Sequence, residues 1–394
     1  MTASTVFIRT RSIGPIVRYA PGHIDVSDLD ALQIIHKANK GYRNSDWSHS
    51  LAPPGGRDAH EHHQPHGPHP LASSAGWSLP RQISSETRAR GCIQDDHALS
   101  RMEEELEQRG CIDVLKWWIY MALDVIIELR YGASVNILED GEENRYMIDY
   151  LEGLRPLYAT IKAYKRLLAE ESPMPTLFTP LFDKGDKGFT YTQITHLAGS
   201  NITAGSHTTT TVRTLTIWAI CKRPKVRDKL VKEVSQLPEG FKHNDVRNLP
   251  YLNCVIQESV RLYAAVPSVL PRAVPQGGVD INGYFIHEGT TTSTQCHSLH
   301  WREDYFLNAL QFDPERWVSP TKEMEEAYMG FGASTRSCVG TNLAHTELRL
   351  RVAHFFRNFP RTTASSKEGM NDDEMRHRAW GFMSLVGHRR LFDA

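Results

Sequence analysis

The sequence has almost no excess of one charge, since 45 lysines and arginines stand against 46 aspartates and glutamates. A balanced chain creates no strong field for nucleic acid or for an anionic membrane surface. A long apolar run is also missing near the start, where Val6–Ile8 is far shorter than a signal-peptide core or a membrane span. These absences favour small-molecule chemistry, without a nucleic-acid partner or a transmembrane anchor.

Paired cysteines are missing as well. The six cysteines are dispersed and form no CxxC pair: Cys92, Cys111, Cys221, Cys254, Cys296 and Cys338. A disulfide scaffold or a structural zinc site is therefore not expected. The chain does have the material for a large core, because 40% of its 394 residues are hydrophobic and 23% are charged.

Apolar periodicity is scarce over residues 48–90, where the stretch AHEHHQPHGPHP is rich in histidine and proline. This composition predicts an insertion without regular structure. Two other interpretations stay open. The histidines can bind metal adventitiously, or the segment reflects a frame or splice error.

The remaining chain shows mostly helical patterns. Residues 14–26 alternate as a small sheet does, with Ser27 as the expected cap of a helix that follows. Favourable residues predict a helix that stops at Gly110, and Ile112–Arg130 is apolar enough for a long buried helix ended by Gly132.

Residues 191–220 predict one helix of about 30 residues. Its middle is weak, because glycines and β-branched threonines disfavour a helix, and such a helix often accommodates something there. Two more helical patterns follow, and short hairpin strands are expected over residues 267–292. A last helix is expected from Cys338 to Phe359. The predicted fold class is mainly α with a small β portion.

FGASTRSCVG, residues 331–340, carries the strongest signal. Glycines permit close backbone approach, and the start of a helix favours a thiolate at Cys338, which can serve as nucleophile or metal ligand. The stretch resembles the haem-binding loop of the cytochrome P-450 family through Phe331, Arg336, Cys338 and Gly340. The resemblance implies that Cys338 is the axial ligand of haem iron, that Phe331 packs near the sulfur and that Arg336 pairs with a haem propionate. Where the family has a second glycine this chain has Ser334, which predicts strain at positive φ.

Two further motifs occur in the family's order. QESVR places Glu258 and Arg261 on one helical face, a spacing that is commonplace in solvated helices. In the family this pair binds an arginine downstream, which FDPERW supplies as Arg316. The resemblance implies a structural role for these three.

AGSHTT, residues 204–209, resembles the family's oxygen-activation motif. Thr208 matches the threonine that hydrogen-bonds dioxygen, and the glycine is expected to loosen the helix. His207 replaces the usual acid, and an imidazole with a pKa of about 6.5 can still relay protons.

VPSVLPRAVP looks like the family's strand beside the substrate, with Arg272 as a further propionate partner. The family's third core helix falls in the histidine-rich segment, where Arg57, Asp58 and His60 are its expected remnant. Fungal relatives also begin with a membrane anchor, whereas this chain begins near the first sheet. The expected fold is thus one P-450 domain over residues 1–394, truncated at the N-terminus and altered around that helix. It divides into a sheet and helix at 1–47, the atypical segment at 48–90 and a haem-binding core at 91–394.

The resemblance, which extends to filamentous-fungal enzymes of secondary metabolism, implies a monooxygenase with haem b. NADPH would supply electrons through a reductase, and one atom of O2 would enter an apolar organic substrate. One alternative is dehydration, isomerisation or peroxide-dependent chemistry on the haem. Another is a truncated relative without turnover. A cytoplasmic or peripheral location is expected for the chain as written.

Overall fold

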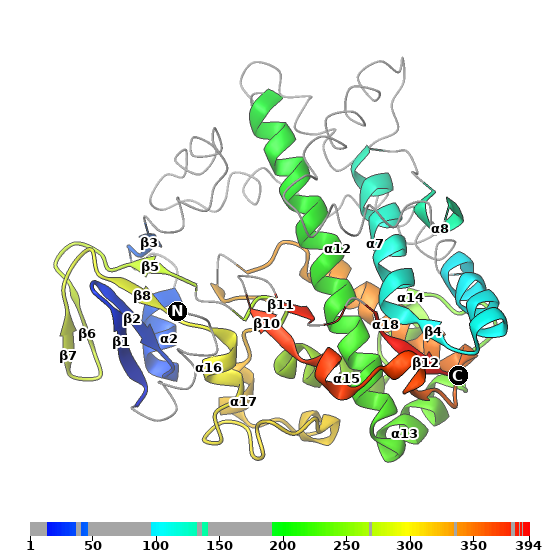
Figure 1. The fold of residues 1–394 in the computed structure, drawn as a ribbon. Helices are drawn as coiled ribbons and strands as arrows, with labels where there is room; N and C mark the ends of the chain where they lie inside the picture. The colour runs from blue at the N-terminus through cyan, green and yellow to red at the C-terminus, as the bar shows by residue number, and fades with distance from the viewer. Residues whose placement is uncertain are drawn as a thin grey trace. The chain divides into compact units, whose positions relative to one another are not determined.

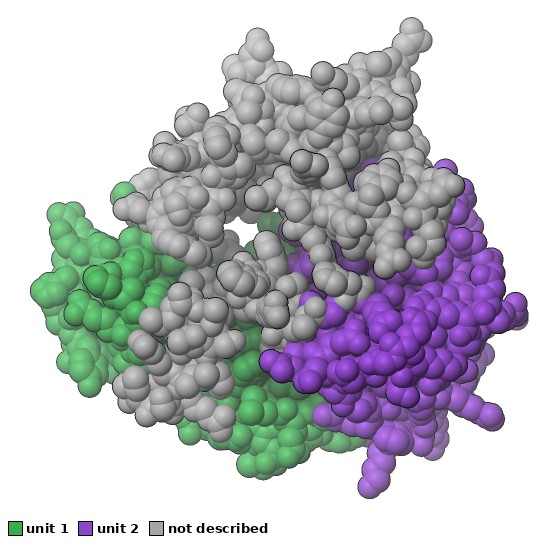
Figure 2. Space-filling model, in the orientation of Figure 1, with its two compact units in different colours: residues 1–74, 254–341, 377–384 green, residues 75–253, 342–376, 385–394 purple. Residues whose placement is uncertain are grey.

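A computed structural model of the chain describes residues 14–36, 41–45, 96–131, 136–140, 191–267, 270–334, 337–379, 383–385, 387 and 389–394. Residues 48–90, with Arg57, Asp58 and His60, lie outside these ranges, as does Arg336. The chain divides into two compact units (Figure 2). Unit 1 comprises residues 1–74, 254–341 and 377–384, and unit 2 comprises residues 75–253, 342–376 and 385–394.

Unit 1 contains a five-stranded sheet in the order β1-β2-β8-β5-β3 (Figure 1). The strands are β1 (Ile16–Ala20), β2 (His23–Val26), β8 (Thr291–Ser293), β5 (Arg272–Ala273) and β3 (Arg43–Asn44). β2 runs parallel to β8, and the other neighbours are antiparallel. The sheet predicted near the start of the chain is therefore confirmed, and distant strands from residues 272–293 complete it.

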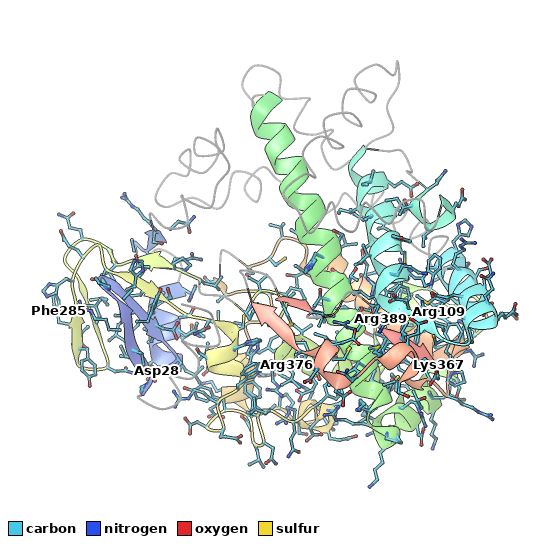
Figure 3. The ribbon with its side chains drawn as sticks, in the orientation of Figure 1. Asp28, Arg109, Phe285, Lys367, Arg376 and Arg389 are labelled. Atoms are coloured by element: carbon cyan, nitrogen blue, oxygen red, sulfur yellow. The ribbon has the colours of Figure 1, made fainter. Side chains whose placement is uncertain are left out.

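Helix α2 (Leu29–His36) follows β2 after a short connection. Its cap is Asp28 (Figure 3), whose Oδ1 accepts from the N–H of Ala31 at 3.0 Å. The prediction of Ser27 as the cap was wrong by one residue. Ser27 instead bonds back to the carbonyl of Pro15. Both residue types are good caps, and the tertiary bond decides between them.

Strands β6 (Val279–Ile281) and β7 (Tyr284–Ile286) form the predicted hairpin. Asn282 and Gly283 make its two-residue turn with φ of 51° and 81°. Positive φ at both positions is what a type I′ turn requires, and an Asn-Gly pair adopts it at little cost.

The rest of unit 1 is built from short helices. They are α16 (Cys296–His300), the 3₁₀ turn η3 (Pro314–Trp317) and α17 (Lys322–Ala327), together with α15 (Pro250–Leu262) from Cys254 onward. Phe306, Trp317 and Ala327 share one apolar cluster, and Cys296 and Met329 share another. β10 (His377–Ala379) pairs with β11 (Met383–Leu385).

Unit 2 is mainly helical. Its elements include a helix over residues 96–109, α7 (Val114–Tyr131), α8 (Ile137–Asp140), α12 (Tyr191–Cys221), α13 (Pro224–Val234), α14 (His243–Val246) and α18 (Thr341–Asn358). The turns η5 (Lys367–Gly369) and η6 (Asp372–Met375) follow α18, and β4 (Ile112–Asp113), β12 (Leu391–Asp393) and β9 (Thr363–Ala364) form a small sheet in that order. The predicted fold class, mainly α with a small β portion, is confirmed.

Two predicted helix starts were displaced. The helix expected from Ile112 begins at Val114, because Ile112 and Asp113 pair with β12. The helix expected from Cys338 begins at Thr341, because the N–H of Cys338 is bound to the loop. Local propensity cannot reveal such tertiary hydrogen bonds.

The long helix α12 lies beside α7 (Figure 1). Gly205 explains the close approach, since a Cβ there would lie 3.0 Å from Cδ1 of Ile126 on α7. Thr210 Oγ1 donates to the carbonyl of Trp118 at 3.2 Å, which adds a polar link between the helices. The helix stays unbroken through its middle, so the expected loosening at Gly205 is replaced by a packing role.

Charged side chains join the helix over residues 96–109 to the end of the chain. Glu368 accepts from Arg109 at 2.6 Å and from Arg389 at 2.7 Å, while Lys367 donates to the carbonyl of Gly110 (Figure 3). Within the described ranges, no helix combines the length and apolar composition that crossing a membrane requires.

Candidate functional site

The loop that carries Cys338 is closed by its own backbone. The N–H of Cys338 donates to the carbonyl of Phe331 at 2.7 Å, and the N–H of Gly332 donates to that of Met329 at 2.9 Å. On the other side, Thr341 Oγ1 donates to the carbonyl of Cys338 at 2.6 Å. These bonds fix Cys338 between a tight loop and the first residue of α18.

Ser334 turns the loop in the left-handed region, with φ of 57°. This is the strain that the sequence predicts where the family has glycine. The carbonyl of Ser334 accepts from both the N–H and the hydroxyl of Ser337, which helps to hold the turn. Gly332 is also left-handed, with φ of 81°, at no comparable cost.

Cys338 is accessible. Among the five cysteines that the structure describes, it alone is exposed. A Cβ on Gly340 would lie 3.7 Å from its Sγ, an ordinary contact distance, so the protein alone does not require glycine there. The missing Cβ leaves room for a group bound at the sulfur. Phe331 is half-buried in the same loop.

The structure brings Glu258, Arg261 and Arg316 together inside unit 1. Arg261 donates from Nε and Nη2 to the two carboxylate oxygens of Glu258, both at 2.8 Å, and Arg316 Nε donates to Oε1 at 3.1 Å. Glu258 and Arg261 are fully buried. The spacing that is commonplace in solvated helices is here a buried ion pair, and loss of one partner from such a pair typically costs about 3–5 kcal/mol.

Two partners of Glu258 were missed from the sequence. The indole N–H of Trp317 donates to Oε2 at 2.9 Å, and the backbone N–H of Asp313 donates to Oε1 at 2.9 Å. Trp317 stands next to Arg316 in FDPERW, so its place in that motif was the available signal. The bond from Asp313 is donated by its backbone N–H, which almost any residue could supply, so the sequence does not indicate it.

Arg272, predicted as a propionate partner, lies in β5 and is largely buried. Its Nη1 donates to Asn44 Oδ1 at 3.1 Å and to the carbonyl of Pro271 at 3.0 Å. These contacts hold the guanidinium against β3.

Thr208 and His207 lie in the middle of α12 in unit 2, and both are half-buried. The hydroxyl of Thr208 donates to the carbonyl of Ala204 at 2.5 Å. Its hydrogen is therefore used within the helix, while the oxygen keeps lone pairs that accept a hydrogen bond.

A conventional metal centre is not found in the part of the chain that the structure describes, since no three His, Cys, Asp or Glu side chains gather as a ligand set. Cys338 thus offers a single donor. A single thiol is a donor that would hold haem iron if that group were bound.

Comparison with known proteins agrees with these features. The Cytochrome P450 family model matches residues 155–384. Cytochrome P450 monooxygenase orf2 of Aspergillus niger is 38% identical over 98% of this chain and 86% of the relative. Cytochrome P450 monooxygenase azaI of the same species is 36% identical over 97% of this chain and 94% of the relative.

A third relative, the inactive cytochrome P450 monooxygenase cloA of Claviceps fusiformis, is 36% identical over 43% of this chain and 34% of its own length. The first two matches extend over nearly the whole chain, and the family model covers more than half of it. The chain therefore belongs to the cytochrome P450 family, as an oxidoreductase of the fungal monooxygenase type.

Proposed function

We propose that this chain inserts one oxygen atom from O2 into an apolar organic substrate of fungal secondary metabolism, with haem b bound through Cys338. The observation that carries the proposal is the exposed thiol of Cys338, held by the loop and the start of α18. A single thiol donor beside a glycine suits the axial position of haem. The residues present therefore fit the group that the family implies.

Bound haem supplies the oxygen chemistry, in which two electrons and two protons let one oxygen atom enter the substrate while the other leaves as water. NADPH, acting through a reductase, is the proposed electron source. Cys338 would bind the iron as thiolate, and Phe331 is proposed to pack near the sulfur. Arg336 and Arg272 are the proposed propionate partners.

On α12, Thr208 and His207 are proposed to serve proton delivery. The hydroxyl oxygen of Thr208 accepts a hydrogen bond in the observed geometry, because its hydrogen goes to Ala204. To donate a proton, it must release that bond. His207 carries an imidazole that can both take up and return a proton near neutral pH.

Glu258, Arg261 and Arg316 are proposed to act structurally. Their buried contacts tie α15 to the segment of residues 307–317. None of the three needs to touch substrate for this role.

The test is turnover of the haem-loaded chain on a panel of apolar substrates, with NADPH and a reductase in one series and peroxide alone in another. The proposal predicts oxygenated product, labelled from ¹⁸O2, in the reductase series and none with Cys338→Ser. Product in the peroxide series alone would support the alternative that His207 motivates. Haem binding without product in either series would place the chain with relatives such as the inactive Claviceps protein.

A further inference from the structure

Met329, two residues before Phe331, is buried with both of its backbone polar groups bound by side chains of α16. The N–H of Met329 donates to Nε2 of His300 at 3.0 Å, and the thiol of Cys296 donates to its carbonyl at 3.2 Å. Cys296 and His300 are four residues apart, so they lie on one face of α16. One short helix thus holds a single residue, Met329, by both of its backbone polar groups.

The protonation states of both side chains suit these bonds. Burial raises the pKa of Cys296 to about 12, so the sulfur keeps its hydrogen and can donate it. Burial and the charge of Arg261 lower the pKa of His300 to about 3, so the imidazole is neutral. An N–H can only donate, so Nε2 of His300 carries no hydrogen and Nδ1 is the protonated nitrogen.

His300 also contacts the Glu258 set through Arg261. Nδ1 of His300 donates to the carbonyl of Arg261 at 2.8 Å, and Nη1 of Arg261 donates to the carbonyl of His300 at 2.6 Å. The two residues bind each other's backbone reciprocally. The imidazole also stacks on Tyr328, with the ring centres 5.6 Å apart.

The chain beyond Met329 has little room to move. A Cβ on Gly330 would lie 2.3 Å from Cγ1 of Val260 on α15, so this segment is pressed against the helix that carries Glu258 and Arg261. The carbonyl of Met329 also accepts from Gly332, and the carbonyl of Phe331 accepts from Cys338. A continuous series of hydrogen bonds therefore runs from Arg261 through His300 and Met329 to the loop of Cys338.

We propose that His300 and Cys296 are positioning residues for Cys338. Their side chains fix Met329, and through it the loop that presents the thiol, against the buried set of Glu258, Arg261 and Arg316. The proposal rests on the proposed haem-thiolate function for its consequence at the iron. The hydrogen bonds that carry it lie wholly within unit 1 and can be measured without haem.

The first test replaces His300 by phenylalanine, which keeps a ring against Tyr328 but leaves the N–H of Met329 and the carbonyl of Arg261 without their partner. A stranded buried N–H opens more readily, so amide exchange in peptides covering residues 328–333 should accelerate about tenfold or more in the full chain. In the haem-loaded protein, a smaller fraction should show the red-shifted Soret band of thiolate ligation after reduction under carbon monoxide. The expected loss is at least half of that band, with total haem content retained.

His354→Phe is the matched control. His354 in α18 is also a partly buried histidine, with its pKa lowered to about 4 by burial, and it stacks on Phe241 at 4.1 Å. Its Nε2 has no hydrogen-bond partner among the described residues. This substitution should change neither the exchange of residues 328–333 nor the thiolate band.

The second test uses Cys296, where Cys296→Ser keeps a donor and Cys296→Ala removes it. Cys296→Ser should keep the wild-type rate of amide exchange in residues 328–333 and the wild-type fraction of the thiolate band. Cys296→Ala should speed the exchange and reduce the band, as His300→Phe does. If His300→Phe does not fold, this pair decides the matter. Equal values for serine and alanine, or a folded His300→Phe that matches His354→Phe, would overturn the proposal. If the wild type shows no thiolate band, the proposed function fails, and the exchange comparison alone then decides whether the two residues fix Met329.

Discussion

Ser334, where the resemblance predicts a glycine, has φ of 57°, and this conformation carries a cost. The left-handed region costs a non-glycine residue about 1–2 kcal/mol. Replacing Ser334 by glycine would relieve this cost, but the greater conformational freedom of glycine in the unfolded chain offsets part of the relief. Ser334→Gly should therefore raise the free energy of unfolding by about 0.5–1 kcal/mol, measured by urea titration.

Ser235→Gly is the control for this prediction. Ser235 has φ of −65°, which any residue adopts readily, so glycine there relieves no strain. It adds its entropic cost and removes the hydroxyl that donates to the carbonyl of Lys232 at 2.9 Å. The control should be slightly destabilising. A loss of stability in Ser334→Gly as large as that of Ser235→Gly would contradict the assignment of strain.

Asp25 is fully buried in β2, and burial raises the pKa of its carboxyl to about 7 although Gln295 and Ser298 donate to Oδ2. The native state thus holds a proton between pH 3.8 and about 7 that the unfolded state has released. This contribution to stability is lost as pH rises through that window. The side chain of Asp25→Asn does not titrate. The free energy of unfolding of this variant, relative to that of the wild type, should therefore increase by about 1 kcal/mol for each unit that the pH rises through the window.

Urea unfolding of both proteins at about pH 5 and about pH 7 measures this difference. The variant must be compared with the wild type because His300 also changes stability with pH. Its pKa is lowered to about 3, so its effect makes the free energy of unfolding increase as pH rises toward its ordinary pKa, opposite to the effect of Asp25. A variant whose stability relative to the wild type is the same at both pH values would show that the carboxyl of Asp25 stays ionised.

His207 stands where the resemblance predicts an acid. If it limits proton delivery, His207→Asp should leave folding unchanged and raise the share of consumed NADPH that appears as product several-fold. Thermal unfolding is the control for folding, and parallel assays of NADPH, peroxide and product give the coupling. Unchanged coupling would remove His207 from the proton path.

At the scale of elements, the contact of α7 with α12 is the most readily tested. Gly205 faces Ile126 so closely that a larger side chain must displace it. Gly205→Val should destabilise unit 2 by about 1–3 kcal/mol through overpacking. Ile126→Ala makes room, so the double variant should lose less than the sum of the two single losses.

A double-mutant cycle from urea unfolding gives this coupling. Additive losses would mean that the helices do not meet at Gly205. The cycle therefore tests the packing role of the glycine directly.

Elements could be predicted where the signal is local. The hairpin strands expected between residues 267 and 292 and the single long helix α12 were both predicted correctly from the sequence. The starts of α7 and α18 were not, because Ile112 pairs with β12 and Cys338 bonds to Phe331. Those contacts are tertiary, and neither propensity nor periodicity contains them.

At the scale of the whole molecule, motifs predicted a set of candidate site and structural residues, but not how unit 1 holds them. Cys338, Glu258, Arg261 and Arg316 were identified by spacing and resemblance. The contribution of His300 could not be, since it acts on the backbone of Met329 and Arg261 and belongs to no spaced motif. Every residue except proline offers the same backbone N–H and carbonyl, so the identities of Met329 and Arg261 do not indicate that His300 binds them.

The central claim is that Cys338 binds haem iron as a thiolate. Its most direct test is the absorption spectrum of the purified, dithionite-reduced chain with and without carbon monoxide, beside that of Cys338→Ser. The account predicts a strongly red-shifted Soret band in the wild type and its loss in the variant. An unshifted band from haem-loaded wild type, or a red-shifted band that survives in Cys338→Ser, would contradict it.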